Sequence, residues 1–451
     1  MTMKRLLKNN VWRVVLVLAA IMIAWKIISV NLADHFVKLA GEGDQSALDS
    51  ALFWDAGHPR VLVLQGERLL ESGQEDLAEK FLIEAVQANP ADARPLILLA
   101  DIRRKRGEES VADQMVETAS RLMPVDGNIQ RAVAVYWYER GMLDLAVEHL
   151  STALAGNYWK LRDELFPVFL KIAETPGAHE TLAPLAEDPP LWWEGFVVYA
   201  TKNAENVDTL RVIATMRKSS DKVPISKRER NTYIQRLRKE GLLAEAYLHW
   251  VNGLDKEQRQ LLGYIYNGNF EHELSNSGFG WYARLPKNSG IIINTAITYG
   301  IEGKQALYLS FKGKRVRFRH LRQPLFLDAG TYRVTGRVRP DKLRARKGLQ
   351  WVALCTVGAK GKLGESRPFL GTGDWREFEF DINVPPECRG QLLQLRSVGN
   401  RDVDHEVKGE IWFDDMHIQL QRQELRTEHA EQVSGSVQEP GSEIDEKNQS
   451  K

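Results

Sequence analysis

The residues whose types and spacing best suit ligand binding lie in the last third of the chain, where arginines are concentrated. Thirteen Lys or Arg residues and two Asp residues occupy the stretch from Lys312 to Lys347. Alternation with a period of two places some of these arginines on one face of each of two expected strands. They are Arg315, Arg317, Arg319, Arg333, Arg337 and Arg339. If the two strands are neighbours, the guanidinium groups form a patch that suits carboxylate, sulfate or phosphate oxygens. Pairing with the acidic stretch 402–410, or a solvated face, is the alternative.

Aromatic side chains form a second group with binding potential. Trp281 and Tyr282 stand in a loop flanked by glycine, where we expect them to contact a ligand, because an aromatic ring can pack on the apolar face of a sugar. Trp412 alternates with Met416 and Ile418, which predicts a place in the core. Trp375 comes just before a strand and is expected to pack against a neighbouring loop.

A search for catalytic motifs finds none. The chain has no GxSxG or HExxH sequence, no phosphate-binding loop and no dinucleotide fingerprint, and its histidines lack the spacing of metal ligands. We therefore expect no catalytic residues and a protein that is not an enzyme. A polysaccharide-modifying enzyme with two carboxylates around a cleft is the alternative.

Composition limits the other classes of function. The 451 residues suggest about three domains, and 61 Lys+Arg against 60 Asp+Glu give a net charge of +1. This balance excludes a uniformly basic nucleic-acid binder, and no nucleic-acid partner is expected. Cys355 and Cys388 have no CxxC partner, which excludes a zinc ribbon. In an oxidising compartment they can form a disulfide, and two buried thiols are equally consistent with the sequence.

The hydrophobic pattern changes from a helical period to a period of two near Tyr264. Alternating segments separated by glycine and proline turns then predict an antiparallel β-sandwich over residues 264–420. The expected strands are 306–311, 332–338, 351–357, 378–384, 392–397 and 411–420.

Four short motifs of this region resemble the galactose-binding-like jelly rolls found among carbohydrate-binding modules. They are Asn267-Gly268-Asn269-Phe270-Glu271, Gly280-Trp281, Gly373-Asp374-Trp375 and Glu410-Ile411-Trp412-Phe413-Asp414-Asp415-Met416. The resemblance implies that the sandwich binds a polysaccharide. It also implies a structural calcium that joins the first and last strands, with Glu271 and Asp414 or Asp415 as ligands. The acidic side chains capping a turn or facing solvent are the alternative, and no other cofactor is expected.

The segment from Ala33 to residue 260 is helical and repetitive. A shift of 34 residues superposes Gly73, Gly107 and Gly141, and further Ala, apolar and Pro columns align with them. This pattern resembles the tetratricopeptide repeat (TPR) family, whose helix pairs stack into an α-solenoid that binds protein partners. Clear repeats are 59–92, 93–126 and 127–160, and degenerate ones are 161–226 and 227–260. The basic cluster Arg103 to Arg106 is expected to cap a helix end.

The N-terminus predicts a membrane anchor. Residues 14–32 are almost entirely apolar, and the preceding stub, 1–13, is basic, which places the N-terminus in the cytoplasm and the bulk of the chain in the periplasm. A cleaved signal peptide is the alternative. At the other end, the polar tail 421–451 is expected to be disordered.

The predicted fold class is therefore multidomain, α then β: one transmembrane helix, a TPR-type solenoid, a jelly-roll sandwich and a disordered tail. This arrangement resembles membrane-anchored proteins of bacterial exopolysaccharide biosynthesis. It implies a non-catalytic inner-membrane scaffold with protein partners on its repeats and a polysaccharide, acidic or neutral, on its sandwich. A purely protein-protein assembly factor is the other alternative.

Overall fold

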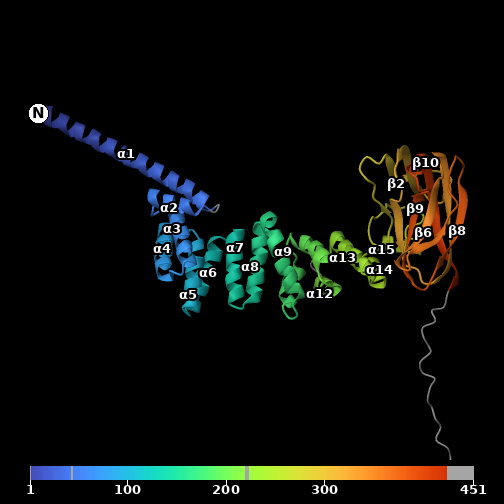
Figure 1. The fold of residues 1–451 in the computed structure, drawn as a ribbon, viewed down its shortest axis with the longest axis horizontal. Helices are drawn as coiled ribbons and strands as arrows, with labels where there is room; N and C mark the ends of the chain where they lie inside the picture. The colour runs from blue at the N-terminus through green and yellow to red at the C-terminus, as the bar shows by residue number, and fades with distance from the viewer. Residues whose placement is uncertain (1, 42–43, 219–222, 424–451) are drawn as a thin grey trace, which may run out of the picture. The chain divides into compact units, whose positions relative to one another are not determined.

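The computed structural model describes residues 2–41, 44–218 and 223–423, and it divides the chain into two compact units. The described residues of Met1–Ile225 form helices and turns, whereas those of Ser226–Lys451 form three α-helices followed by two antiparallel sheets that make a β-sandwich (Figure 1). The predicted fold class of helices followed by a sandwich is confirmed. Of the predicted tail, 421–423 belong to the last strand and 424–451 lie outside the described residues.

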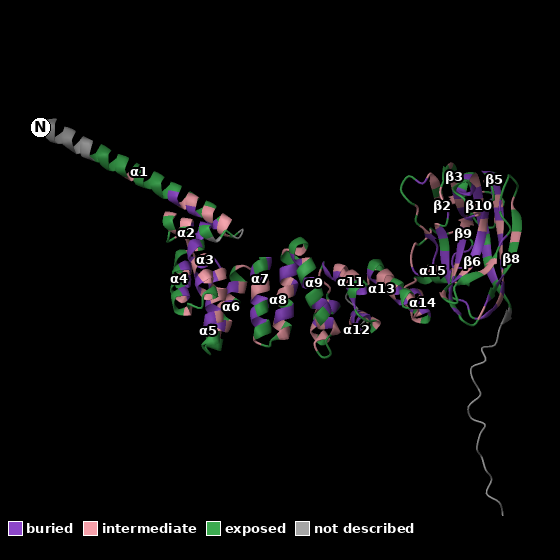
Figure 2. Cartoon of the chain, viewed as in Figure 1, coloured by how far each residue is buried: buried purple, intermediate pink, exposed green. Residues whose placement is uncertain are grey.

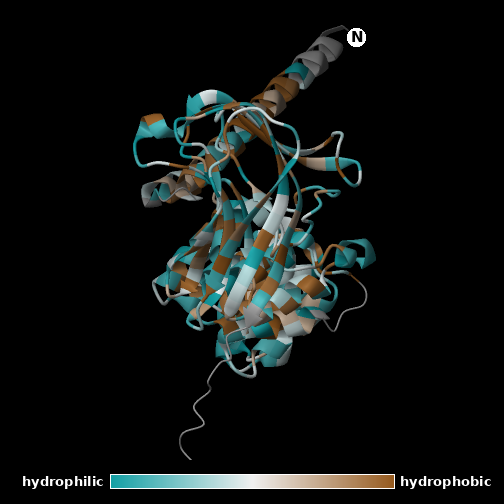
Figure 3. Cartoon of the chain, turned by 90° about the vertical axis from the view of Figure 1, so that its right-hand side faces the viewer, coloured by the Kyte–Doolittle hydropathy of each residue, from teal (hydrophilic) through white to brown (hydrophobic). Residues whose placement is uncertain are grey.

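The first helix, α1 (Thr2–Gly41), has two parts with different surroundings. The large apolar side chains from Trp12 to Ile28 are exposed (Figure 2), and Figure 3 shows the hydropathy of the same helix. Ala33 and Val37 are buried in contact with the following helices. The stretch Trp12–Gly41 is long and apolar enough to cross a membrane, a property that a signal sequence shares. The exposed part alone is about 26 Å long at 1.5 Å per residue, close to the thickness of a hydrocarbon core.

Helix pairs recur every 34 residues after α2 (Gln45–Trp54). The pairs are α3 (Pro59–Glu71) with α4 (Glu75–Ala88), α5 (Arg94–Lys105) with α6 (Glu109–Leu122), and α7 (Gly127–Glu139) with α8 (Leu143–Gly156). Gly73, Gly107 and Gly141 end the first helix of each pair with φ of +76°, +82° and +74°. This left-handed conformation is costly for residues with a Cβ, which explains the glycine at each turn.

Small buried residues let the paired helices approach closely. Ala78, Ala112 and Ala146 occupy equivalent positions in α4, α6 and α8, and each is at most 2% exposed. The apolar residue four positions later fills the groove between helices, as Leu82 and Val116 do. The 34-residue spacing therefore reflects a repeated packing unit.

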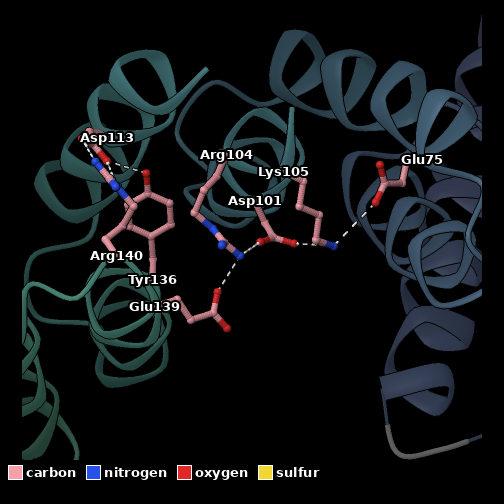
Figure 4. A network of polar contacts seen from close by, with 8 residues as sticks. All are labelled: Glu75, Asp101, Arg104, Lys105, Asp113, Tyr136, Glu139 and Arg140. Carbon is pink, nitrogen blue, oxygen red and sulfur yellow. Dashed lines mark hydrogen bonds and ion pairs between the residues drawn. The ribbon is translucent and has the colours of Figure 1, made fainter. Parts of the chain in front are cut away.

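The basic cluster Arg103 to Arg106 links successive helix pairs. Arg104 contacts Asp101 in its own helix at 2.6 Å and Glu139 of α7 at 2.6 Å, while Lys105 contacts Glu75 of α4 at 3.6 Å (Figure 4). Arg106 extends the same pattern to Glu79 of α4 at 2.6 Å. The cluster lies at the C-terminal end of α5, as expected for residues that cap a helix, and its charges also pair with acids of neighbouring repeats.

The remaining helices of this unit are less regular. They are α9 (Tyr158–Glu174), η1 (His179–Leu182), α10 (Ala183–Glu187), α11 (Trp193–Asn203) and α12 (Val207–Lys218). Pro167 lies inside α9, where it cannot donate a backbone hydrogen bond. Trp192 and Trp193 are buried and pack with phenylalanines of α9 and α11.

The sandwich consists of two five-stranded antiparallel sheets. One has the order β1 (Tyr282–Ala283), β4 (Leu321–Leu325), β9 (Cys388–Ser397), β6 (Leu349–Gly358) and β7 (Gly361–Glu365). The other has the order β2 (Ile291–Ile297), β3 (Gln305–Arg315), β10 (Glu406–Gln423), β5 (Gly330–Arg344) and β8 (Arg376–Val384). A short η2 (Asp402–His405) precedes β10.

One continuous core fills the space between the sheets. Its largest members include Trp281, Trp351 and Phe413, and Cys355 of β6 forms a disulfide with Cys388 of β9. The bond joins neighbouring strands of one sheet, so it closes a loop of 33 residues within the domain.

Three helices, α13 (Lys227–Lys239), α14 (Leu243–Asn252) and α15 (Lys256–Gln260), belong to the same compact unit as the sandwich. A Cβ on Gly278 would lie 2.0 Å from the Trp250 ring, and one on Gly390 would lie 2.4 Å from Leu243. The α14 helix is therefore seated closely on the sandwich. Residues 227–260, which the sequence assigns to the last repeat, group with the β domain.

Candidate functional site

A row of side chains crosses β2, β3, β10 and β5 of the five-stranded sheet and continues to the residue before β8. The antiparallel register places Asn294 opposite Tyr308, Tyr308 opposite Trp412, and Trp412 opposite Arg339. Trp375, which directly precedes β8, lies 5.6 Å from the Arg339 guanidinium. The residues beside them along β3, β10 and β5 are buried, so this row lies on the face turned away from the core. We call this surface the aromatic face. It comprises Asn294, Tyr299, Tyr308, Arg339, Trp375 and Trp412.

The aromatic rings of this face converge on Arg339. Its guanidinium carbon lies 4.8 Å from the centroid of Tyr299, 5.1 Å from that of Trp412 and 5.6 Å from that of Trp375. Tyr308 and Trp412 have centroids 4.5 Å apart and planes inclined by 43°. Cation–π attraction of this kind holds the guanidinium among the rings and fixes the rings relative to one another.

Arg339 has hydrogen-bonding capacity left over. Its Nη2 donates to Thr298 Oγ1 at 3.1 Å, whereas Nε is buried with no partner among the described residues. Arg339 forms no ion pair with any of the described residues. A buried donor without a partner carries a desolvation cost that a bound acceptor would relieve.

The loop 298–304 forms one wall of the aromatic face. Trp375 Nε1 donates to the carbonyl of Tyr299 at 2.8 Å, and Arg337 Nη2 donates to the carbonyl of Gly300 at 2.8 Å. These bonds hold the loop in place while the Tyr299 ring remains 75% exposed. The exposed ring is thus presented by a tethered loop.

Glu271 holds the other end of this loop. Its Oε1 accepts hydrogen bonds from the backbone N–H groups of Lys304 at 2.8 Å and Gln305 at 3.0 Å. Gly303 has a φ of +102°, and a Cβ there would lie 2.2 Å from the Glu271 carboxylate. The Glu271 carboxylate can therefore take this position because residue 303 is a glycine.

A β-bulge explains why Trp412 is on this face. The register of β10 against β5 shifts between Asp414 and His417, and Asp415 has a φ of +51°. The extra residue reverses the alternation, so Met416 and Ile418 are buried in the core while Trp412 points outward. The prediction of a core position for Trp412 is wrong because it assumed unbroken alternation through this bulge.

Polar groups border the rings. The Tyr308 hydroxyl lies near Ser310 and Glu410, and burial, followed by the effect of Glu410, raises the pKa of this phenol. Glu410 is opposite both Ser310 of β3 and Asp341 of β5. Exposed ring faces bordered by carboxylates, a hydroxyl and an amide can bind a molecule that has both apolar faces and hydroxyl groups.

Asp414 is buried on the same side of the sheet, opposite Arg337. Only 1% of it is exposed, and its Oδ1 has no hydrogen-bond partner among the described residues. Burial raises the pKa of Asp414 to about 7, and the negative charges of Asp415 and Glu271 contribute to the increase. The chain therefore keeps a carboxyl group that is partly protonated near neutral pH beside the loop-holding Glu271.

The three carboxylates expected to bind calcium are not equivalent. Glu271 and Asp414 interact electrostatically, and the orphan Asp414 Oδ1 fits a cation ligand. Asp415 Oδ1 instead contacts His417 Nε2 at 2.5 Å, and its side chain is half exposed. No cluster of three acidic, His or Cys side chains suited to a metal is found among the described residues. A cation here would need backbone carbonyls to complete its shell of six or more oxygens.

The arginines predicted from strand alternation are divided by the topology. Arg333, Arg337 and Arg339 share the outward face of β5, as expected. Strand β10 separates β5 from β3, so Arg315 at the end of β3 is not their neighbour. The idea of one continuous guanidinium patch from adjacent strands is therefore corrected.

Several of these arginines pair within the domain. Arg315 contacts Glu406 at 3.1 Å, within the acidic stretch that was the alternative explanation. Arg333 contacts Asp381 of β8 at 2.8 Å. Arg317 and Arg319 are exposed between β3 and β4. Only Arg337 and Arg339 of the predicted set contact the aromatic face.

Trp281 and Tyr282 are not available to the aromatic face. Trp281 is 1% exposed in the core, packs against Phe270 and Trp351 with tilted ring planes, and donates from Nε1 to the carbonyl of Asn267 at 3.2 Å. Tyr282 is 9% exposed on β1, in the other sheet. The glycine-flanked loop that suggested a ligand contact is packed inward, which corrects the expectation for Trp281.

The helical unit has a separate groove. It has a volume of about 630 Å³ and is lined mainly by α3, α5 and α7, including Arg60, Glu67, Arg94 and Ile97. Burial raises the pKa of Glu67. Arg94 Nε donates to Asp92 Oδ1 at 3.0 Å at the groove wall. The first helices of successive repeats thus share a surface with both apolar and charged groups.

Comparison with known proteins finds no matching protein-family model and no matching curated protein. Solved structures similar to part of the chain include the CBM22-1 xylan-binding domain of Paenibacillus barcinonensis Xyn10C. It has 16% identity and a TM-score of 0.25, covering 34% of this chain and 91% of that domain. A CBM4 structure has 17% identity and a TM-score of 0.24, covering 35% and 99%. TmCBM61 in complex with β-1,4-galactotriose has 19% identity and a TM-score of 0.23, covering 36% and 99%.

Proposed function

We propose that this protein binds a polysaccharide through the aromatic face of its β-sandwich. The observation that carries the proposal is the Tyr308–Trp412 pair, whose rings lie 4.5 Å apart on the outward side of the sheet and are only partly covered. The exposed Tyr299 ring adds a second surface. Aromatic rings bind the C–H face of a pyranose, while Asn294, Ser310 and Glu410 are placed to bind its hydroxyl groups.

The proposal includes acidic polymers. Arg337 and Arg339 lie among the rings and form no ion pair within the described residues, so a uronate or sulfate group could take that role. Glu410 and Asp341 on the same side suit neutral hydroxyl groups equally well. Both neutral and acidic polymers should therefore be tested for binding.

We further propose that the 34-residue helix pairs are tetratricopeptide repeats that hold a protein partner in the groove of α3, α5 and α7. The mixed lining of Arg60, Glu67 and Ile97 supports a peptide ligand with charged and apolar side chains. Together with α1 as an uncleaved anchor, this makes the protein a non-catalytic scaffold of the bacterial inner membrane. Its bulk would lie in the periplasm and serve exopolysaccharide or envelope polysaccharide assembly.

A structural calcium between Glu271 and Asp414 belongs to the same proposal. The orphan Oδ1 of Asp414 and the raised pKa of its carboxyl group support it, since a divalent cation would favour the ionised form. Addition of CaCl₂ should raise the melting temperature of the wild-type chain and leave that of Asp414→Asn unchanged. An equal response of both proteins would contradict this part.

Affinity electrophoresis of the full chain in detergent tests polysaccharide binding. The gels would contain neutral polymers such as xylan and galactan, or acidic polymers such as alginate and polygalacturonate. We expect at least one polymer to retard the wild-type chain and to retard Trp412→Ala much less. Trp159→Ala is the matched control, because Trp159 is an exposed tryptophan in the helical unit. Migration unaffected by every polymer would contradict the proposal and favour the assembly factor that binds only proteins.

Membrane fractionation tests the anchor. We expect the chain in the membrane fraction with residues 2–32 still present by intact mass, and in the soluble fraction when those residues are deleted. A mature chain that begins after residue 30 would establish the signal-peptide alternative.

A further inference from the structure

A pocket lies on the sheet β1-β4-β9-β6-β7 of the β domain, which is the sheet opposite the aromatic face. It has a volume of about 510 Å³ and is formed between the end of α13 and the outward side of β1, β4 and β9. Tyr282, Arg322 and Leu392 contribute from the strands, while Arg238 and Lys239 contribute from α13. All of these residues belong to one compact unit, so the pocket is a feature of a single folded body.

The charge of this pocket has one sign. Its cationic lining residues are Arg238, Lys239, Arg284 and Arg322, and its lining contains no Asp or Glu. None of the four cations has an ion pair within the described residues 223–423. Burial lowers the pKa of Arg238, and the neighbouring charge of Arg322 lowers it further. The fold thus brings like charges together without a compensating acid, and an anion bound among them would reduce their mutual repulsion.

Arg238 is held in a fixed position within this pocket. Its Nη1 donates to the carbonyl of Gly278 at 3.0 Å and to the Tyr282 hydroxyl at 3.3 Å. Its guanidinium carbon lies 5.5 Å from the Phe279 ring and 5.9 Å from the Tyr282 ring. These neutral contacts leave the positive charge uncompensated, and other N–H groups of the guanidinium remain for a ligand.

The surroundings keep the pocket in shape. A Cβ on Gly278 would overlap Trp250, and Gly390 lies directly against Leu243, so the helices cannot shift without losing this contact. Tyr282 lies in the field of three arginines, Arg238, Arg284 and Arg322, all of which act on its hydroxyl. The cations therefore converge on one region.

We propose that this pocket is a binding site for a small polyanion that carries at least two phosphate or carboxylate groups. Several guanidinium groups around one volume favour several anionic oxygens held at the same time, because each fork binds two of them. The apolar side chains of Phe279 and Leu392 leave room for a carbon frame between the charged groups. The site is separate from the aromatic face and does not depend on polysaccharide binding there.

Calorimetric titration of the full chain in detergent tests this site. The probes are pyrophosphate and citrate. Inorganic phosphate and acetate, which carry one phosphate or one carboxylate group, are their counterparts, and glycerol is the neutral control. We expect pyrophosphate or citrate to bind at least about tenfold more tightly than its counterpart, and glycerol not to bind. Binding of pyrophosphate alone would identify phosphate as the recognised group, and binding of citrate alone would identify carboxylate.

Variants connect the binding to the pocket. Arg284→Ser and Arg322→Ser should each weaken binding by about tenfold or more, since each removes a charged donor. Arg344→Ser is the matched control, because Arg344 is an exposed arginine on the opposite sheet. Melting curves of all variants establish that they are folded. The proposal is overturned if neither polyanion binds, or if Arg344→Ser weakens binding as much as the pocket variants.

Discussion

Trp412 of β10 and Tyr308 of β3 are directly opposite each other in the register of the sheet, and their ring centroids are 4.5 Å apart. Both rings are on the outward side, although each is flanked along its strand by buried core residues. Large aromatic rings are buried in most folded proteins, and this partly exposed pair in the middle of a five-stranded sheet is the basis of the proposed binding surface.

The first prediction concerns Arg339. Arg339→Ala removes the cation from among Tyr299, Trp375 and Trp412, so the rings lose a shared partner. We expect affinity for the retained polysaccharide to fall by about tenfold, measured by affinity electrophoresis at several polymer concentrations. Arg333→Ala is the control, because Arg333 is on the same strand and pairs with Asp381. Equal losses in the two variants would point to a general charge effect.

The second prediction concerns the pH dependence of stability. Asp414 has a pKa of about 7 in the folded chain against 3.8 when unfolded, so the folded state binds more protons between these values. Its contribution to stability is therefore greatest below about pH 4, decreases as the pH rises to about 7, and is constant above that.

Asp414→Asn removes this dependence. The variant should gain roughly 1 to 4 kcal/mol over the wild type at pH 8 in calcium-free buffer, and much less at pH 4, by urea unfolding followed by fluorescence. Asp374→Asn, at an exposed site of the same domain, is the control. If the unfolding free energies of the wild type and Asp414→Asn instead rise in parallel from pH 5 to pH 8, then ionisation of Asp414 does not destabilise the folded state. That result would contradict the prediction.

These sites show what the sequence can and cannot predict. Alternation along β5 correctly placed Arg333, Arg337 and Arg339 on one face, because that strand is regular at these positions. Trp412 was assigned to the core because one additional residue, at the Asp414–Asp415 bulge, reverses which side chains point inward. The adjacent Asp414 and Asp415 are the signal that could have indicated the bulge, because strict alternation would turn one of the two carboxylates toward the core.

Other features depend on contacts between distant segments. Tyr299 joins the aromatic face through contacts that include the hydrogen bond that Trp375, 76 residues later, donates to its carbonyl. The separation of β3 from β5 by β10 is a property of the sheet order, which alternation within a strand does not contain. The 34-residue period, in contrast, is local: Gly73, Gly107 and Gly141 each end a helix with a positive φ, so the sequence predicted those turns.

The third prediction concerns the disulfide. Cys355 and Cys388, which are 33 positions apart in the sequence, are joined across neighbouring strands. The double variant Cys355→Ala/Cys388→Ala should lose about 3 kcal/mol of unfolding free energy, chiefly because the unfolded chain becomes less constrained. Urea unfolding of the oxidised wild type, the reduced wild type and the variant provides the measurement. The reduced wild type should resemble the variant. Identical midpoints for all three proteins would mean that the bond is absent in solution or contributes nothing.

The most direct test of the central claim is calorimetric titration of a defined oligosaccharide, cut from a polymer that retards the wild-type chain, into wild type and Trp412→Ala. Stacking of a sugar on the Tyr308–Trp412 pair predicts that the variant binds at least about tenfold more weakly, while its melting temperature stays close to that of the wild type. Trp159→Ala should bind as the wild type does. An unchanged affinity in folded Trp412→Ala would contradict the assignment of the aromatic face as the polysaccharide site.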